Sequence, residues 1–305
     1  MLIVTTLLRQ VLSMFVMVAL GYLLFRSGKI SQDGSRALGN ILIYLALPSV
    51  IINCFLIERT PEHIRGLGLS ALAAALVLAV AVVLSHVFFK RDAIAAFSAA
   101  FSNPGFFGVP LIVATIGQDS VCYIAFFIAF LNILQWTYGV SIMTGQPALD
   151  GLKPRKLLKA PFVIALLVGL FLFFTALPLP KLLTDCLSSV AALNTPLAMF
   201  TIGIYLAQTD VPRMFRRTIL YKVSLVRLLV IPLSAVLILS FFPSGLFDLK
   251  MAILLAVACP VGSNVAVYAQ LHGKDYPYAV ETVVISTLFS LLSIPALAYL
   301  ASAIW

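Results

Sequence analysis

Ten long apolar stretches, separated by short polar links, make up almost the whole chain. They cover residues 4–25, 37–57, 66–89, 93–116, 120–143, 160–178, 182–208, 214–242, 249–271 and 277–304. A helix needs about 20 consecutive apolar residues to cross the hydrocarbon core of a bilayer, and each stretch has about that length. The pattern therefore predicts an all-α polytopic membrane protein with ten transmembrane helices.

Composition excludes a soluble protein. Hydrophobic residues form 62% of the 305 residues and charged residues only 10%, and the mean hydropathy is +1.10. Soluble domains are about half apolar and about a quarter charged, so most of this surface must face lipid. The first stretch lacks a convincing small-residue cleavage site, and we interpret it as a retained span. No stretch is left over for a separate soluble domain.

The net charge of +9 does not indicate a nucleic-acid partner, because the basic residues lie in short links and form no stripe with interleaved aromatics. They are divided unequally between the two ends of the predicted spans. Cytoplasmic links carry an excess of Lys and Arg, so we assign the richer side to the cytoplasm and both termini to the extracytoplasmic side. The richer side carries Arg26, Lys29, Arg36, Lys90, Arg91, Lys153, Arg155, Lys156, Lys159, Arg213, Arg216, Arg217, Lys222 and Lys274, and the poorer side Arg9, Arg59, Arg65, Lys181 and Lys250.

The longest link, residues 144–159, divides the chain into halves of five stretches each, 1–143 and 160–305. An odd number of crossings makes the second half enter the membrane from the opposite side, so related halves would form an inverted repeat. Matching residues support this relation. Pro104, Gly117 and Asp119 recur 156 positions later as Pro260, Gly273 and Asp275, and Pro48 and Pro196 lie in the second and seventh stretches.

Two segments break the helical pattern in the middle of spans: SNPGFFGVPL at 102–111 and CPVGSNVAVYAQ at 259–270. Proline removes a backbone donor and glycine loosens a helix, and in hydrocarbon the freed groups must be satisfied by protein, water or substrate. Matching breaks in two halves indicate a transporter binding site, with half-helix N-termini suited to an anion. The alternative is that the breaks only kink the spans. The candidate substrate-binding residues are Asn103, Pro104, Gly105, Gly108, Pro110, Pro260, Gly262, Ser263 and Asn264, and Pro48 and Pro196 are candidates for lining the pathway.

Polar groups within the spans are candidates for coupling or gating. Glu281 lies about one turn into the tenth stretch, where a carboxylate is costly and indicates function; it is otherwise an interfacial or helix-start residue. For Arg227 we weigh a side chain that snorkels to the cytoplasmic interface against one that binds substrate or a carboxylate. For Asn132 and Gln135 we weigh hydrogen bonds that join neighbouring helices against contacts with a ligand.

Asp119 and Asp275 each follow a glycine just before a span. This spacing favours glycine C-caps and aspartate N-caps, with ion coordination as the alternative. The four cysteines are scattered, and neither a metal-ligand spacing nor a catalytic motif occurs. We therefore expect neither an enzyme nor a bound metal or cofactor, although a proton or sodium ion could couple to transport.

The broken segments resemble the auxin efflux carrier family, which includes bacterial malate and malonate permease-like proteins and the plant PIN carriers. SNPGFFGVPL is similar to its N-x-x-x-x-G-x-P element, Pro260 and Gly262 to its P-x-G element, and VETVVISTLFSLLSIP to its last helix. The resemblance implies two inverted five-helix repeats with broken, crossing helices 4 and 9. It also implies a scaffold of helices 1, 2, 6 and 7, against which helices 3–5 and 8–10 move like an elevator. The short central link favours a bacterial-type member in the plasma (inner) membrane.

The resulting function hypothesis is a secondary active or facilitative transporter of small organic anions in the lipid bilayer. Its substrates would be mono- or dicarboxylates such as malate, malonate or auxin-like acids, moved by elevator-type alternating access. We also consider a homodimer through the scaffold helices. One alternative is a sodium-coupled symporter or cation/proton antiporter of similar fold, but the carboxylate pair expected of an antiporter is not found. An intramembrane enzyme or a sensor is a third alternative.

Overall fold

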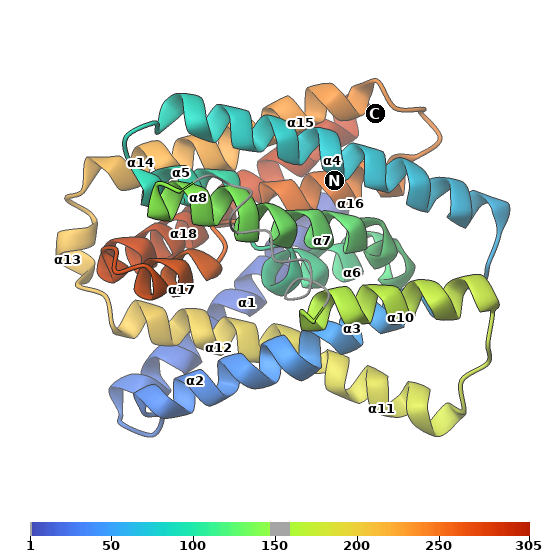
Figure 1. Cartoon of the computed structure of the whole chain (residues 1–305), viewed down its shortest axis with the longest axis horizontal. Helices are drawn as coiled ribbons and strands as arrows, with labels where there is room; N and C mark the ends of the chain where they lie inside the picture. Colours follow the sequence, from blue (N-terminus) through green and yellow to red (C-terminus); the bar gives the residue numbers. More distant parts are fainter. Residues whose placement is uncertain (1, 147–158) are drawn as a thin grey trace.

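The computed structural model describes residues 2–146 and 159–305, and the basic residues Lys153, Arg155 and Lys156 of the central link lie outside this part. Within the described residues the chain is helical, and its β-structure is one isolated bridge between Ser102 and Val261. The predicted all-α class is therefore confirmed for this part of the chain. Figure 1 shows the long helices running side by side along the longest axis of the molecule.

Helices occur in all ten predicted stretches. The first half contains α1 (Leu2–Arg26), α2 (Gln32–Ile41), the π-helix η1 (Leu42–Ala46), α3 (Leu47–Cys54), α4 (Pro61–Phe88), α5 (Ala93–Ala100), the π-helix η2 (Pro104–Gly108), α6 (Val109–Ile116), the 3-10 helix η3 (Gln118–Ile124), α7 (Ala125–Leu134), the π-helix η4 (Gln135–Gly139) and α8 (Val140–Thr144). The second half contains α10 (Pro161–Thr175), α11 (Lys181–Ala192), α12 (Asn194–Ala207), α13 (Val211–Met214), α14 (Thr218–Leu225), the π-helix η6 (Val226–Val230), α15 (Ile231–Ser240), α16 (Phe247–Ala258), α17 (Asn264–Leu271) and α18 (Tyr276–Ile304).

Seven helical segments of the described chain are long and apolar enough to cross a membrane. They are Val4–Arg26, Gln32–Cys54, Pro61–Phe88, Gln118–Thr144, Lys181–Ala207, Thr218–Ser240 and Tyr276–Ile304. Pro104–Ile116 and Pro161–Thr175 are apolar but shorter. Breaks at 101–103 and 259–263 shorten the helices of the fourth and ninth stretches, so ten crossings remain a prediction.

Local signals explain where several helices begin. α4 starts after Thr60, whose Oγ1 accepts a hydrogen bond from the His63 amide at 3.2 Å, and Pro61 occupies the first turn, where its missing N–H costs nothing. α18 starts in the same way after Asp275, whose Oδ1 accepts from the Tyr278 amide at 3.0 Å. The predicted N-cap at Asp275 is thus confirmed.

Prolines also explain three of the π-helices among the described residues. Each of η1, η2 and η6 ends two residues before a proline, namely Pro48, Pro110 and Pro232. In each case the residue just before the proline donates its amide to the carbonyl five positions back. A proline ring clashes with the carbonyl four positions back, and one wider turn relieves this clash.

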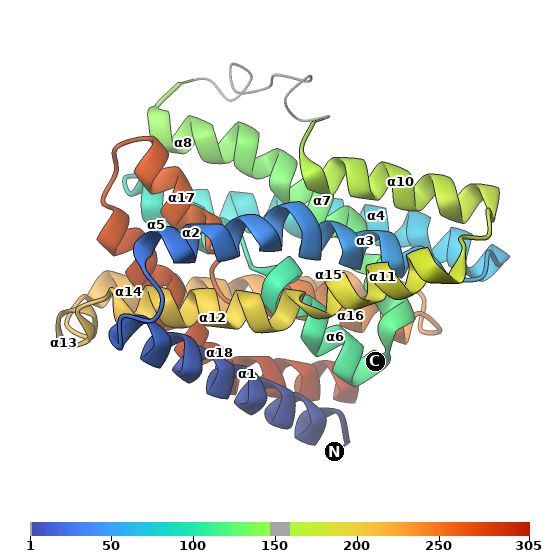
Figure 2. The same ribbon diagram turned by 90° about the horizontal axis from the view of Figure 1, so that it is seen from below.

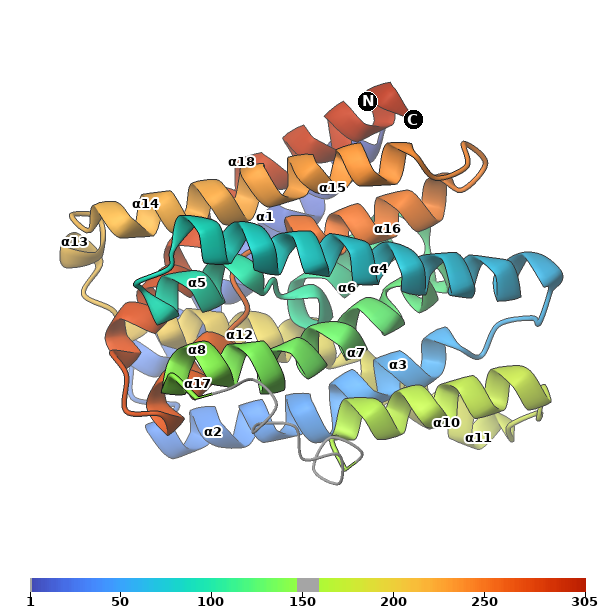
Figure 3. The same ribbon diagram turned by 45° about the horizontal axis from the view of Figure 1, so that its top comes forward.

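The helices form two packed groups. By their contacts, one group holds α1, α2–α3, α10 and α11–α12, and the other holds α4–α8 and α14–α18, with α1 also packed against α6 and α18 of the second group. In Figure 1 α2, α10 and α11 lie toward one edge of the molecule and α4 and α15 along the opposite edge. In Figure 3 α2, α10 and α11 again lie along one edge, and α15 and α18 lie toward the other. α1 packs closely along α12, because Gly21 and Gly203 have no side chain at the contact. A Cβ atom at either position would collide with the backbone of the other helix.

The beginning of α1 and the end of α18 lie at the same end of the molecule, as Figures 2 and 3 show. The two helices also pack against each other. At the end of α18, Nε1 of Trp305 donates to Oγ of Ser240 at 2.9 Å, which ties the last residue to α15. The placement of both ends at one face agrees with an even number of crossings.

Candidate functional site

The two broken helices meet at their breaks. The amide of Asn103 donates to the carbonyl of Pro260 at 3.0 Å, and the amide of Gly262 donates to the carbonyl of Phe101 at 2.9 Å. These bonds join the segment between α5 and η2 to the segment between α16 and α17. They satisfy backbone groups that the proline-containing breaks would otherwise leave unpaired in an apolar interior.

Glycine is required at one position of this contact. A Cβ atom built on Gly262 would lie 2.8 Å from the carbonyl oxygen of Ser102, which is closer than real Cβ contacts allow. The amide of Val261, next to it, is held by Oγ of Ser286 in α18 at 3.0 Å. The sequence therefore specifies the close approach through a glycine in the second break and a serine in α18.

A small cavity of about 100 Å³ lies at the crossing. Its walls collect residues from both breaks together with residues of η1, α3, α7 and α10. Among the predicted site residues, the walls include Asn103, Pro104, Gly105, Gly262, Ser263, Asn264 and Asn132. Of the remaining predicted site residues, Pro260 contributes its carbonyl to the backbone contact, and a Cβ on Gly108 would lie 3.1 Å from Sγ of Cys259.

Two polar atoms at this cavity, Oγ of Ser102 and Nδ2 of Asn103, are buried without a hydrogen-bond partner in the described part of the chain. The side-chain Nδ2 of Asn264 instead donates to Oε1 of Gln135 in η4 at 2.8 Å. Nε2 of Gln135 is buried and has no partner among the described residues. Buried donors without a partner are costly, so these groups are available to a ligand with acceptor oxygens.

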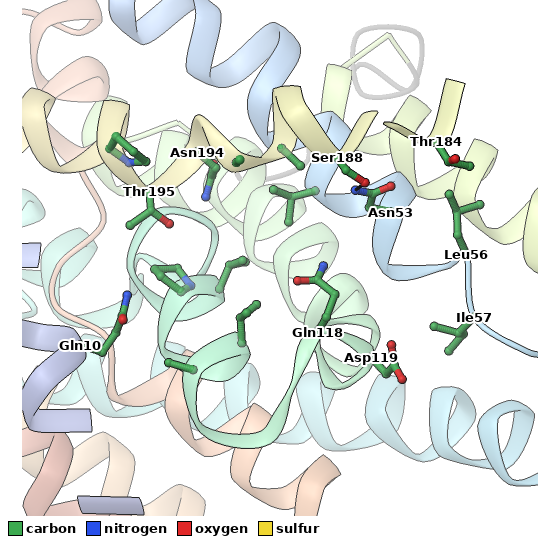
Figure 4. A pocket seen from close by; sticks show the side chains of 18 of the residues that line it. Gln10, Asn53, Leu56, Ile57, Gln118, Asp119, Thr184, Ser188, Asn194 and Thr195 are labelled. Atoms are coloured by element: carbon green, nitrogen blue, oxygen red, sulfur yellow. Dashed lines mark hydrogen bonds between the residues drawn. The ribbon is translucent and has the colours of Figure 1, made fainter. Parts of the chain in front are cut away.

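A larger cavity of about 870 Å³ lies between the two helix groups. Figure 4 shows its side chains: Gln10 of α1, Asn53 of α3, and Thr184, Ser188, Asn194 and Thr195 of α11 and α12 face Gln118 and Asp119 of η3 across it. Pro110 and Pro196, both predicted site residues, also line it. Asp119 is the one charged side chain among its described lining residues, which are otherwise neutral polar groups and apolar side chains.

Asn194 connects α12 with the crossing and was not predicted from the sequence. Its Nδ2 donates to the carbonyl of Gly105 at 2.8 Å, and its buried Oδ1 has no partner among the described residues. The sequence feature that could have indicated Asn194 is its position shortly before Pro196, which is similar to that of Asn103 before Pro104. A carbonyl freed by Pro104 and Gly105 needs such a donor.

Of the two alternatives weighed for Arg227, a side chain that snorkels outward is wrong, because the side chain is buried inside the bundle. Its side chain is 1% exposed, and its Nη1 donates to the carbonyls of Ala99 at 2.9 Å and Ala100 at 3.0 Å. Nη2 donates to the carbonyl of Val257. The guanidinium therefore joins the C-terminal ends of α5 and α16, the two helices that lead into the breaks.

Glu281 is buried, at 4% exposure, and forms an ion pair with Arg217, whose Nη1 lies 2.8 Å from Oε2. Arg217 also lies 3.9 Å from Oδ2 of Asp275, and its guanidinium is stacked 5.6 Å from the ring centre of Tyr278. The Tyr278 hydroxyl donates to Oδ2 of Asp92 at 2.9 Å. Glu281 is thus part of an ionic cluster that links α14, α18 and the start of α5. Whether this cluster lies at the membrane interface or serves in coupling stays a prediction.

The predicted glycine and aspartate caps and the two polar residues of the fifth span are confirmed only in part. Gly117 and Gly273 adopt φ values of 93° and 63° after α6 and α17, as expected for helix ends. Asp119 does not cap η3 through its side chain, because the N-cap position belongs to Gly117. Gln135 does join two spans, whereas Nδ2 of Asn132 donates to the carbonyl of Ile128 in its own helix at 2.7 Å. The residue next to Pro48, Leu47, lines the small cavity.

A bundle of apolar helices with two paired breaks and adjoining cavities is the architecture of a membrane transporter. The family model described as "Membrane transport protein" matches residues 6–298, so the chain belongs to this family. This confirms the resemblance to the auxin efflux carrier family.

Two curated relatives agree with this assignment. One, from Rhizobium meliloti (strain 1021), is named "Putative malonate transporter" and is 27% identical over 95% of this chain and 94% of its own. Another, an uncharacterized transporter of Methanocaldococcus jannaschii, is 24% identical over 93% of this chain and 95% of its own.

Proposed function

We propose that this protein is a secondary active or facilitative transporter of small organic anions, in particular mono- or dicarboxylates of the size of malonate or malate. The observation that carries this proposal is the pair of hydrogen-bonded breaks with unpaired donors at a small cavity. The helices Pro104–Ile116 and α17 begin at this cavity, and helix N-termini favour negative charge. The malonate-transporter name of one relative supports the same substrate class.

The proposed binding residues are the predicted residues that reach the crossing. Nδ2 of Asn103 and Oγ of Ser102 donate to a carboxylate, and Asn264 and Ser263 approach it from the opposite break. Neutral donors suit this task because they do not leave a permanent unpaired charge in the empty site. Pro104, Gly105, Gly108, Pro110, Pro260 and Gly262 shape the backbone around the ligand.

The proposed mechanism is alternating access by an elevator movement in a fold of two inverted five-helix repeats. α1, α2–α3, α10 and α11–α12 form the scaffold, and α4–α8 together with α14–α18 form the moving body. The large cavity between these groups supports the assignment, because it gives the side chains of η3 and α6 access to solvent at one end of the molecule. The orientation follows from the positive charge of the links and places both termini on the extracytoplasmic side.

The proposal is tested by transport in proteoliposomes made from the purified full-length chain. We expect uptake of radiolabelled malonate, competed by malate and by other small dicarboxylates, above that of protein-free vesicles. Imposed proton and sodium gradients then identify the coupling ion or show that transport is facilitative. Sodium flux without carboxylate flux would instead support the cation-transporter alternative, and the absence of any flux would refute both.

A further inference from the structure

The Arg227 side chain lies between the C-terminal ends of α5 and α16, next to the two breaks, and we call this arrangement the Arg227 junction. Its guanidinium donates to the carbonyls of Ala99 and Ala100 at the end of α5 and to that of Val257 near the end of α16. The next residues along the chain, 101–103 and 259–263, are the two breaks. One side chain therefore serves the C-terminal ends of both helices that lead into the candidate binding site.

The charge of this junction is not balanced by an acidic side chain. Among the described residues, Arg227 has no ion pair, and its Nε has no hydrogen-bond partner. The C-terminal end of a helix carries about half a negative charge, so the ends of α5 and α16 together carry about one. The guanidinium offsets this charge and removes a negative potential that would otherwise oppose an anion at the crossing.

The backbone holds this side chain in place. Arg227 lies in the π-helix η6, the widened turn that precedes Pro232. Ser224, one turn earlier on the same span, is also buried, and its Oγ has no hydrogen-bond partner among the described residues. Residues three apart lie on one face of a helix, so position 224 offers a way to change the charge next to Arg227 without removing its hydrogen bonds.

We propose that Arg227 is a positioning residue that sets the charge preference of the site: it makes the crossing favour ligands with more negative charge. This proposal rests on the proposed transport of organic anions. A residue that only holds the two helices together would affect ligands of different charge equally. An electrostatic role predicts an effect that grows with the charge of the ligand.

The test compares malonate, which carries two charges at neutral pH, with its monoamide malonamate, which carries one. At an effective dielectric constant of about 20, losing one unit charge in the neighbourhood of a ligand weakens binding roughly tenfold for each charge that the ligand carries. Arg227→Gln should therefore weaken malonamate binding roughly tenfold and malonate binding roughly a hundredfold, measured by calorimetry on the purified chain in lipid nanodiscs. Arg227→Lys should keep the wild-type ratio of the two affinities.

A second pair of variants leaves the guanidinium intact. Ser224→Asp should reduce the preference for malonate over malonamate in the same direction, and the neutral Ser224→Asn should leave it unchanged. If Arg227→Gln does not fold, this pair decides the question. Equal losses for both ligands in Arg227→Gln and Ser224→Asp would overturn the proposal and leave Arg227 a structural clamp. If the wild-type chain binds neither ligand, the proposed transport function fails first.

Discussion

Two asparagines from different halves of the chain reach the same small cavity, but their amide groups are bonded differently. Nδ2 of Asn103 is buried without a partner among the described residues, whereas Nδ2 of Asn264 donates to Gln135 at 2.8 Å. Asn103 can therefore bind a ligand without giving up an existing bond. One of the two Nδ2 hydrogens of Asn264 is already used by Gln135, so Asn264 offers a ligand one donor hydrogen where Asn103 offers two, and its contribution to binding is smaller.

This difference leads to a prediction for alanine variants. Losing a hydrogen bond to a charged ligand costs about 1.5–3 kcal/mol, so Asn103→Ala should weaken malonate binding by roughly ten- to a hundredfold. Asn264→Ala should weaken it less and should also lower the melting temperature, because a half-buried hydrogen bond between spans is lost. Both quantities can be measured on purified protein by calorimetry and by thermal unfolding.

Asn132→Ala is the matched control for both asparagine variants. Asn132 lines the same cavity, but its Nδ2 is already used by the carbonyl of Ile128. Its removal should leave affinity nearly unchanged. Loss of binding in Asn132→Ala, with unchanged binding in Asn103→Ala and Asn264→Ala, would show that the asparagines of the two breaks do not hold the ligand.

The ion pair between Arg217 and Glu281 leads to a second prediction. The Glu281 carboxylate is buried and Arg217 is half-buried, so breaking the pair should cost about 1–3 kcal/mol of stability, less than a fully buried pair. We expect Glu281→Gln and Arg217→Gln to lower the melting temperature by similar amounts, and the double variant to lower it no further than either single change.

The same variants test whether Glu281 carries a coupled proton. A carboxylate held by an arginine serves as a structural link between α14 and α18, so Glu281→Gln should leave the pH dependence of malonate uptake unchanged. A flattened pH profile in a variant of normal stability would contradict this and would identify Glu281 as a proton carrier.

At the scale of the helix, the sequence predicts the two breaks because proline and glycine act locally on the backbone. Pro104, Gly105, Pro260 and Gly262 weaken the helices in which they occur, whatever surrounds them. The contacts of Asn194 and Arg227 could not be predicted in this way. Each contact depends on which helix lies opposite, and that is decided by the packing of the whole bundle.

The π-helices are partly predictable from the local sequence and partly decided by tertiary packing. η1, η2 and η6 each precede a proline by the same spacing, so the position of these prolines is a local sequence signal for the widened turn. η4 has no proline at the equivalent position, residue 141. Its widened turn coincides with the bond between Gln135 and Asn264, a tertiary contact that the local sequence does not reveal.

The contact between the breaks yields a prediction for Gly262. A methyl group at this position would lie 2.8 Å from the Ser102 carbonyl, so Gly262→Ala must separate the two breaks and should cost about 1–3 kcal/mol. We expect a lower melting temperature and little malonate uptake. The control is Gly68→Ala in α4, where a Cβ meets no atom within 4 Å and where alanine favours the helix. Equal behaviour of the two variants would show that the close approach is not required.

At the scale of the whole molecule, the inverted repeat requires five crossings between the central link and the C-terminus. Single cysteines at Gln146 and Ser302, both exposed, can be placed in a Cys186→Ser background, since the other three native cysteines are buried. An impermeant thiol reagent should label Ser302→Cys in intact cells and Gln146→Cys only after permeabilisation. Labelling of both positions from the same side would rule out the ten-span arrangement.

The two hydrogen bonds between the breaks also restrict how chains of this kind can vary in evolution. Each break supplies one donor and one acceptor to the other, so an inserted or deleted residue in either segment would shift both bonds out of register. The lengths of the two breaks are therefore tied to each other. The side chains of Ser102, Asn103, Ser263 and Asn264 take no part in this backbone pairing, so substitution at these positions can change the recognised ligand without altering the frame that holds it.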